Sequence, residues 1–405
     1  MAVSPFSFFR GSACVMAADL APTPRSGIEV QLCGDAHLAN FGGFATPDGG
    51  LVFDLGDFDE TVPGPWEWDV KRLATSLEVA ARERDFGGKA RRQIVTGAVA
   101  RYRASMRAFA GMRNLDVWYA QTDFDGTVDE LRSRLDSAGR KRAEKSAAKA
   151  SQRENLRAFS HLTEVVDGEP RLVSDPPLLV PIGESVHHRG VSDAVDEPIR
   201  KLLRAYRDTL DRDSRGLFAG YRYVDLAHKV VGVGSVGTRA WIVLLLGRDE
   251  DDPLFLQVKE AQRSVLEPFT HKSAFRNQGR RVVEGQRLMQ AAGDSLLGWI
   301  HADGMDGRER DFYVRQLWDC KASPDIDAMD ATALGLHGDL CGSVLARAHA
   351  RSGDRVAIGA YLGRGDRFDR AVHEFAEDYA DQNERDHKAF VKAIKDGRVE
   401  AREGI

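Results

Sequence analysis

Three glycines followed by strand-forming residues place the tightest limit on the fold of this chain. Gly232, Gly234 and Gly237 have the spacing GxGxxG, which several nucleotide-binding folds share. A dinucleotide-binding fold requires a helix directly after these glycines. Residues 238–247 instead read TRAWIVLLLG, and their β-branched, aromatic and aliphatic side chains favour a strand. The segment therefore predicts a glycine-rich turn between two strands, and it argues against a dinucleotide oxidoreductase.

A further strand is predicted over residues 254–259 and ends in Lys259. A glycine loop between strands, followed by a strand that ends in lysine, is the arrangement that kinases use to hold nucleotide phosphates. The alternative for Lys259 is an ordinary surface lysine. A buried lysine needs a carboxylate partner. We expect that partner to be Glu284, in the helix predicted over residues 273–292. Glu267, which lies before this helix, is the weaker candidate.

A dense group of acidic and polar residues lies much earlier in the chain. The segment GDAHLAN, residues 34–40, comes first, and a short apolar run then leads into Asp54, Asp57, Asp59 and Glu60. Grouped carboxylates repel one another, so they usually require a cation or solvent. Carboxylates beside an amide and a possible general base favour Mg²⁺ and phosphate chemistry. The alternative is an acidic turn at the end of a strand.

Local patterns predict how this acidic group is brought together. A strand over residues 28–33 delivers Asp35 to a loop, and a hairpin over residues 40–55 follows it. Asn40 and Asp57 then lie close to Asp35 at one end of a small sheet. The other predicted elements are a helix over 69–82, mostly helical sequence over 88–160, helices over 198–210, 334–351 and 368–394, and a strand over 311–317.

Composition limits the classes of partner. The chain has 405 residues, enough for one large or two ordinary domains, and its net charge of -5 gives no basic field for nucleic acid. Its four cysteines form no CxxC pair, which fits a reducing cytosol and predicts no zinc site. No apolar run approaches the length that spans a bilayer. We therefore expect a cytoplasmic protein with no membrane or nucleic-acid partner, and oligomeric state is not predicted.

The segment GDAHLAN resembles the catalytic loop of aminoglycoside phosphotransferases and choline kinases, whose loops have the form HGDxHxxN. The resemblance implies that Asp35 is the catalytic base and that Asn40 is a magnesium ligand. Asp57 resembles the second magnesium-binding aspartate of that superfamily, and Asp54 competes for this role. Asp69, in WDVKRLA, resembles the structural aspartate on the following helix. His37 would line the acceptor side or hold the loop, and Cys33 stands where those loops carry their first histidine.

The fold that the resemblance implies is α+β, a protein-kinase-like fold with a small antiparallel β lobe and a large, mainly helical lobe. Kinases have the glycine loop before the catalytic loop. This chain has the reverse order, and we therefore expect a circular permutation. Residues 1–225 would supply the catalytic loop and helices, 226–322 the β lobe and 323–405 the returning helices. The whole chain also looks like a bacterial family of unknown function that is common in actinobacteria.

These motifs predict an ATP- and Mg²⁺-dependent phosphotransferase that acts on an unidentified hydroxyl acceptor, a small molecule. Its nucleotide-binding residues would be Gly232, Gly234, Ser235, Gly237 and Lys259. Two alternatives remain. A pseudokinase-like module would bind nucleotide without turnover, and a metal-dependent hydrolase would use the Asp/His cluster without ATP.

Overall fold

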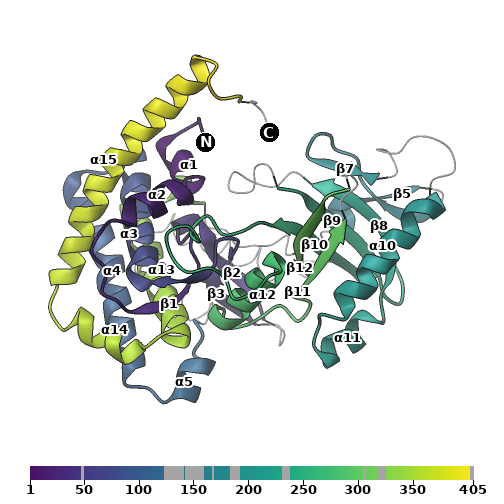
Figure 1. Cartoon of the computed structure of the whole chain (residues 1–405), viewed down its shortest axis with the longest axis horizontal. Coiled ribbons are helices and arrows are strands. Elements are labelled where there is room, and N and C mark those ends of the chain that lie inside the picture. Colours follow the sequence, from purple (N-terminus) through teal and green to yellow (C-terminus); the bar gives the residue numbers. More distant parts are fainter. Residues whose placement is uncertain are drawn as a thin grey trace.

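The computed structural model of the chain describes residues 1–46, 50–122, 141, 159–166, 168–182, 192–229, 238–303, 307–317 and 325–401. Most of the helices gather on one side of the molecule, and a six-stranded sheet with two helices forms the other side (Figure 1). A short strand pair and one helix lie between these two sides. The predicted α+β class is therefore confirmed at the level of mixed helix and sheet.

The helical side is organised around α3 (Trp66–Glu83), α4 (Gly88–Ala110) and α13 (Ala331–Ser352). Helix α3 is buried over almost its entire length, because helices from both ends of the chain pack around it. The remaining helices of this side are α1 (Pro5–Arg10), α2 (Ala13–Leu20), α5 (Asn114–Tyr119), α14 (Arg355–Leu362) and α15 (Arg367–Lys395), with short 3₁₀ turns η1 (Leu38–Asn40) and η3 (Ile326–Ala328).

Glycines bring α13 unusually close to α4. A Cβ atom at Gly342 would lie 2.3 Å from the carbonyl oxygen of Ala98, so no other residue fits there without movement of a backbone. At Gly338, one turn earlier, a Cβ would lie 3.2 Å from Leu77 and 3.3 Å from Ala98, which is closer than ordinary van der Waals contact. This contact joins a helix near the start of the chain to one near its end, and the helical side is therefore a single packed body.

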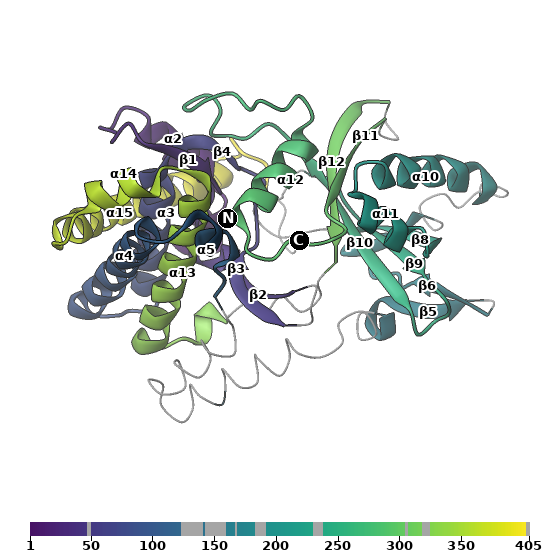
Figure 2. The same cartoon turned by 90° about the horizontal axis from the view of Figure 1, so that it is seen from below.

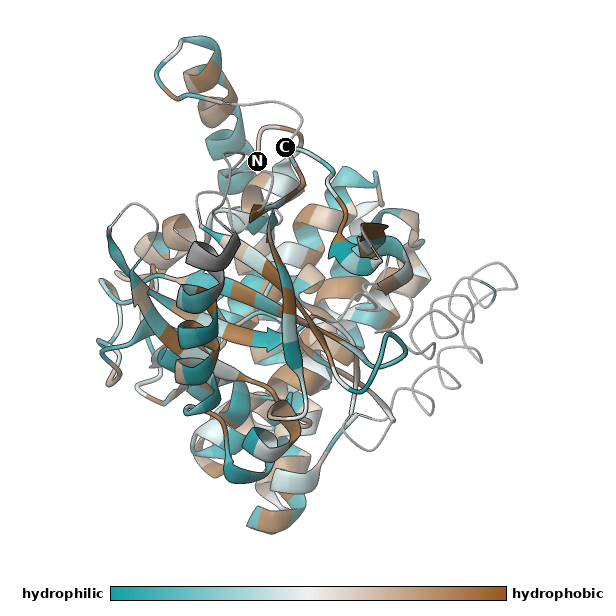
Figure 3. Cartoon of the chain, turned by 90° about the vertical axis from the view of Figure 1, so that its right-hand side faces the viewer, coloured by the Kyte–Doolittle hydropathy of each residue, from teal (hydrophilic) through white to brown (hydrophobic). Residues whose placement is uncertain are grey.

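The sheet has the strand order β11-β12-β10-β9-β8-β7, and all its neighbouring strands are antiparallel. The strands are β7 (Leu179–Pro181), β8 (Arg222–Lys229), β9 (Ala240–Leu246), β10 (Pro253–Ala261), β11 (Gly298–Asp303) and β12 (Glu309–Gln316). Helices α10 (Ser192–Arg207) and α11 (Arg212–Phe218) cover one face with an apolar cluster that includes Tyr206 and Phe218. Figure 3 looks onto this side and shows hydrophilic and hydrophobic residues alternating along its helices and strands.

Three short strand pairs complete the structure. They are β1 (Glu29–Leu32) with β4 (Val62–Pro65), β2 (Phe41–Ala45) with β3 (Leu51–Leu55), and β5 (Thr163–Val166) with β6 (Glu169–Leu172). Helix α12 (Gln278–Met289) contacts both β12 and α13, so it lies between the sheet and the helical side (Figure 2). The first two pairs position the acidic segment that the sequence singles out.

Local patterns predicted most of these elements. The strand at β1, the hairpin of β2 and β3, the strands β9, β10 and β12, and the helices α3, α12, α13 and α15 are confirmed. His337, Gly338 and Asp339, which imitate a catalytic loop, lie inside α13. The sheet side begins earlier than the expected boundary at residue 226, because α10 and α11 pack their apolar residues against the sheet. Helices over residues 198–220 therefore belong to the sheet side.

Within the described residues, no helix combines the length and the apolar character that crossing a bilayer requires.

Replacement of Gly342 by alanine tests the close packing of α13 against α4. We expect Gly342→Ala to lower the free energy of unfolding by about 1–3 kcal/mol, because the added methyl group overlaps the Ala98 carbonyl. Gly335→Ala on the same helix is the matched control, since the nearest atom there lies 3.8 Å away. It should be neutral or stabilising by up to about 1 kcal/mol. Urea unfolding measures both values, and equal values for the two variants would contradict this packing.

Candidate active site

A buried carboxylate on α3 fixes the backbone that leads to Asp35. The side chain of Asp69 accepts the N–H groups of Cys33 at 2.8 Å and Gly34 at 3.1 Å. Nε2 of His349, on α13, lies 3.2 Å from the same carboxylate. Asp69 therefore ties the end of β1 to two central helices. It holds the segment directly before Asp35.

Glycine is required at position 34 for two reasons. Its φ is +84°, a conformation that side chains rarely adopt, and a Cβ would lie 2.3 Å from the carbonyl oxygen of Glu60. That same carbonyl accepts the hydroxyl of Ser264 at 2.8 Å. The loop that carries Asp35 is thus packed directly on the segment that follows Asp57.

Arg72 holds the carboxylate of Asp35. Its Nε donates to Oδ1 of Asp35 at 2.6 Å, and its Nη2 donates to the carbonyl oxygen of Phe9 at 2.7 Å. Asp69 and Arg72 are three residues apart on α3, so both face the loop. Arg72 is buried and its guanidinium also lies over the Phe9 ring. The ion pair therefore fixes Asp35 and connects it to the end of α1.

His37 lies beside Asp35 as a neutral imidazole. Its Nε2 is 3.7 Å from Oδ2 of Asp35, and the side chain is 4% exposed. Burial lowers the pKa of His37 to about 4; the positive charges of Arg72 and Arg10 add to this effect, although Asp35 opposes it. Its Nδ1 is buried without a hydrogen-bond partner among the described residues. The ring therefore has one nitrogen available to a ligand.

At the open end of the β2–β3 hairpin, Asn40 lies beside Gly56, the residue before Asp57. The amide nitrogen of Asn40 donates to the carbonyl oxygen of Asp35 at 2.8 Å, so this hydrogen bond fixes the orientation of the amide. The N–H of Gly56 donates to the carbonyl oxygen of Asn40, also at 2.8 Å, and Asp57 is the next residue. The hairpin thus brings Asp35, Asn40 and Asp57 together, as the sequence predicts.

Lys259, on β10, contacts this acidic segment from the sheet side. Its Nζ forms a hydrogen bond with Oδ2 of Asp59 and lies 3.8 Å from Oδ2 of Asp57, although 200 residues separate Lys259 from Asp59. Burial disfavours the charge of Lys259, yet Asp57 and Asp59 outweigh it and raise the pKa of Lys259 above its ordinary value. Lys259 is therefore a buried, charged residue with carboxylate partners, and not a surface lysine.

Two arginines of the sheet side also hold the acidic segment. Arg281, on α12, donates to the carbonyl oxygens of Asp59 and Thr61 at 2.7 Å each. Arg315, on β12, donates to the carbonyl oxygen of Gly56 at 3.1 Å. Residues 56–61 are therefore held by three cationic side chains from three different elements of the sheet side.

Asp54 is not positioned as a metal ligand, and the structure corrects that alternative. It lies inside β3 opposite Gly42 and is 1% exposed. Its Oδ1 accepts Nη2 of Arg347 at 2.5 Å, and its Oδ2 accepts the N–H of Ala291 at 2.8 Å. Both oxygens are used by the protein, so of the two competing residues only Asp57 faces the site.

Glu284 is not the partner of Lys259. It lies on α12, where it pairs with Arg280 one turn earlier at 3.4 Å. Among the described residues the ion pairs of Lys259 are those with Asp57 and Asp59. The weaker candidate, Glu267, accepts the N–H of Ser273 at 3.3 Å. The prediction failed because the path of the acidic segment beneath β10 depends on tertiary structure.

The four glycine-loop residues, Gly232, Gly234, Ser235 and Gly237, lie outside the described residues. The strand that follows them is described. In the sheet register, Ala240 pairs with Lys259, and the carbonyl oxygen of Arg239 accepts the N–H of Glu260 at 2.8 Å. The strand thus begins opposite Lys259.

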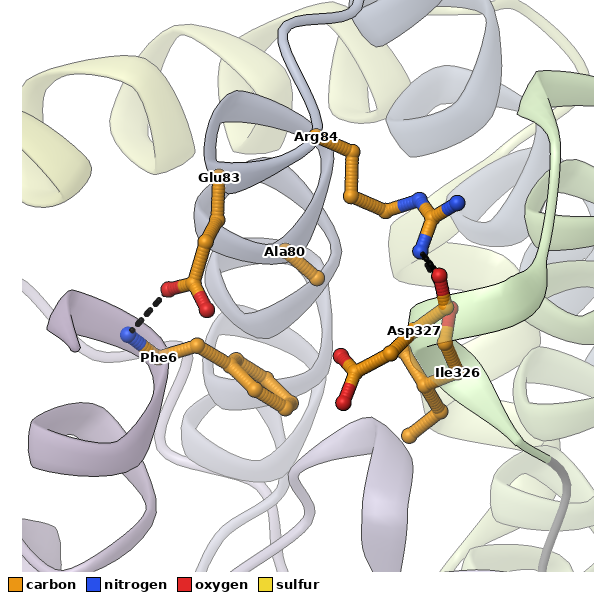
Figure 4. A pocket seen from close by; sticks show the side chains of 6 residues that line it. All are labelled: Phe6, Ala80, Glu83, Arg84, Ile326 and Asp327. Atoms are coloured by element: carbon orange, nitrogen blue, oxygen red, sulfur yellow. Dashed lines mark hydrogen bonds between the residues drawn. The ribbon is translucent and has the colours of Figure 1, made fainter. Parts of the chain in front are cut away.

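Two hollows in the described part of the chain are lined by other residues than those of this group. One of about 290 Å³ lies among Phe6, Glu83, Arg84 and Asp327 (Figure 4). Another of about 430 Å³ lies between α4 and α13. Among the described residues, no three or more His, Cys, Asp or Glu side chains form a group suited to a metal ion.

Sequence reasoning missed two residues of the site. Asp59 forms the hydrogen bond with Lys259, and its position two residues after Asp57 could have indicated it. Arg72 holds Asp35, and its position three residues after Asp69 on a predicted helix could have indicated that both side chains face the same loop.

The chain belongs to a bacterial protein family, since a family model described as "Uncharacterized protein conserved in bacteria (DUF2252)" matches residues 1–393. No curated protein and no solved structure matches the chain.

The two competing aspartates should differ in their effect on stability. Asp54→Asn leaves Arg347 with an uncompensated buried charge, so we expect the free energy of unfolding to fall by about 3–5 kcal/mol. Asp57→Asn is the matched comparison: its carboxylate is 32% exposed and Asp59 still pairs with Lys259, so we expect a smaller loss than in Asp54→Asn. Urea unfolding of both variants measures the difference. A larger loss in Asp57→Asn would contradict the assignment.

His37 gives a prediction about pH. Its pKa of about 4 lies below the ordinary value of 6.5, so protonation favours the unfolded chain. The stability that neutral His37 contributes is complete above about pH 6.5 and is lost as the pH falls through about 4. In ¹⁵N-histidine NMR spectra, assigned with His37→Gln, we expect the His37 ring to stay neutral at pH 5.5. A titration midpoint near 6.5 would show that the ring is solvated.

Proposed function

We propose that this chain is a phosphotransferase, which moves the γ-phosphoryl group of ATP to a hydroxyl group of a small molecule in the presence of Mg²⁺. The observation that carries the proposal is the contact of Lys259 with Asp57 and Asp59, close to Asp35 and Asn40. A buried lysine, two carboxylates, an amide and a further aspartate are the groups that phosphoryl transfer requires. They come from segments about two hundred residues apart.

The fold that we propose is protein-kinase-like in circularly permuted order. Three features support it. The strand that follows the glycine-rich segment begins opposite Lys259, α12 lies between β10 and β12 in the chain, and Asp69 fixes the loop before Asp35. A permutation is physically acceptable because a compact domain tolerates new chain ends at its surface.

Each side chain then has one task. Lys259 would exchange its carboxylate partners for phosphate oxygens and so position the triphosphate. Oδ1 of Asp35 is held by Arg72, and its Oδ2 is left to accept the proton of the acceptor hydroxyl. The acceptor oxygen forms a bond to the γ-phosphorus while the bond from that phosphorus to the bridging oxygen breaks and ADP leaves.

The donor groups fit Mg²⁺. Asn40, Asp57 and Asp59 offer hard oxygen ligands, and Oδ1 of Asp59 is buried without a hydrogen-bond partner among the described residues. Mg²⁺ is commonly bound by one or two protein carboxylates together with phosphate oxygens, so a set this small is sufficient. Bound there, the cation would neutralise charge on the β- and γ-phosphate oxygens.

Replacement of Asp35 tests the proposal. Asp35→Asn keeps an oxygen for Arg72 but removes the base, so we expect phosphoryl transfer to fall at least about 100-fold. Affinity for a fluorescent ATP analogue should stay within about threefold, because the carboxylate does not bind nucleotide. The assay measures ADP and phosphorylated product with Mg²⁺ and a panel of hydroxyl compounds. Asp213→Asn, on the surface of α11, is the control and should retain full activity.

The other outcomes separate the alternatives. Undiminished turnover in Asp35→Asn would show that Asp35 is not the catalytic base. Nucleotide binding by the wild-type protein with no turnover of ATP would indicate a pseudokinase-like binding module. Metal-dependent hydrolysis in the absence of ATP would indicate a hydrolase and would contradict the proposal.

A further inference from the structure

Arg281, on α12, holds the acidic segment by its backbone. Its Nη1 donates to the carbonyl oxygen of Thr61 and its Nη2 to that of Asp59, at 2.7 Å each. Nη2 also donates to the carbonyl oxygen of Gln262 at 2.7 Å, and Nε donates to Oε1 of Gln278 at 2.9 Å. The side chain is 2% exposed, so the guanidinium is bound entirely within the protein.

This guanidinium joins the two segments that meet where Lys259 contacts Asp59. Gln262 lies three residues after Lys259, directly after the end of β10, and Asp59 lies in the other segment. Because one planar group binds carbonyl oxygens of both segments, its geometry fixes the distance between them. Arg281 is therefore placed to set how closely Lys259 approaches the carboxylates.

Two hydrogen bonds of Glu60 join the same segments. Its Oε2 accepts the N–H of Val265 at 2.7 Å, and its carbonyl oxygen accepts the hydroxyl of Ser264 at 2.8 Å. These bonds connect residues 59–61 directly with residues 262–265, whereas Arg281 connects both of them with α12.

Helix α12 packs closely on both of its neighbours. A Cβ atom at Gly279 would lie 2.1 Å from the carbonyl oxygen of Phe312, on β12, and one at Gly285 would lie 2.5 Å from the side chain of Thr61. A helix that is packed this closely has little freedom to shift against either neighbour. The guanidinium that it carries is therefore held in a fixed place.

We propose that Arg281 is a positioning residue, which couples α12 to the contact of Lys259 with Asp57 and Asp59. It acts through the backbone of residues 59–61 and does not touch the lysine. The coupling itself does not rest on the proposed function, whereas its effect on phosphoryl transfer does.

This coupling differs from that of protein kinases, in which a glutamate of a helix pairs with the nucleotide-binding lysine. Here Glu284 of α12 pairs with Arg280, and Lys259 pairs with Asp57 and Asp59. The ammonium group can therefore pass from these carboxylates to phosphate oxygens without breaking a bond to the helix.

The accessibility of Lys259 in the ligand-free protein tests the coupling without an assay of activity. Acetylation by a dilute amine-reactive ester, followed by mass spectrometry, measures the labelling rate of each lysine. In Arg281→Gln we expect Lys259 to be labelled at least about tenfold faster, because the charge-assisted bonds that hold its partners are lost and the contact opens more often. Arg281→Lys keeps the charge but not the forked donors, so its rate should lie between those of Arg281→Gln and the wild type.

Two controls separate this local effect from a loss of the overall fold. Arg280→Gln, at the exposed next position of α12, should leave the labelling of Lys259 at the wild-type rate. Lys71, which is half-buried over the Phe375 ring on the helical side, should be labelled at one rate in all variants.

Equal labelling of Lys259 in Arg281→Gln and Arg280→Gln would overturn the proposal. Parallel acceleration of Lys259 and Lys71 would overturn it too, since Arg281 would then only support the overall fold. If Arg281→Gln does not fold, Arg281→Lys decides the same comparison against Arg280→Gln.

The dependence of phosphoryl transfer on Mg²⁺ tests the effect on the proposed reaction. Arg281→Gln should raise the Mg²⁺ concentration for half-maximal transfer at least about tenfold, because Asp57 and Asp59 are no longer held in place. Arg280→Gln should leave this concentration unchanged, and an unchanged value in Arg281→Gln would overturn the effect on transfer. If Lys259 is labelled faster in Arg281→Gln but the wild-type protein transfers no phosphoryl group, the proposed function fails while the coupling stands.

Discussion

The buried carboxylate of Asp69 is the interaction on which the rest of the site depends. It accepts two backbone N–H groups at the end of β1 and contacts His349 on α13, so one side chain organises three segments. Backbone groups that are buried at a strand end need acceptors, and here the acceptor is ionised, which strengthens each bond. The loop that carries Asp35 owes its shape to this carboxylate, and the helical packing around α3 keeps the carboxylate in place.

A second constraint is the electrostatic attraction between an acidic segment and cationic side chains. Residues 56–61 carry several carboxylates, and they are held by cationic side chains from β10, α12 and β12. The helical side and the sheet side are therefore joined through opposite charges as well as through apolar contacts. Because the lysine of β10 is charged and buried, it depends on those carboxylates or on an anion that takes their place.

Much of this arrangement could be predicted from local sequence. The hairpin and its flanking strand bring Asp35, Asn40 and Asp57 together over a short stretch of chain, so their proximity follows from local periodicity and turn residues. The place of Lys259 required a resemblance to known folds, because no local pattern links residues two hundred positions apart. Its carboxylate partner was assigned wrongly to Glu284, since the path of one segment beneath another is decided by tertiary packing.

The pairing of Lys259 with two carboxylates implies a thermodynamic linkage. The same two carboxylates cannot pair fully with an ammonium group and coordinate a divalent cation at the same time. On the proposed function, a cation bound to the carboxylates would release the lysine toward phosphate, and phosphate bound to the lysine would free the carboxylates for the cation. On the proposed function each ligand should therefore raise the affinity for the other by the same factor. Without ligands, the contacts of Lys259 with Asp57 and Asp59 would compete with both the cation and the phosphate.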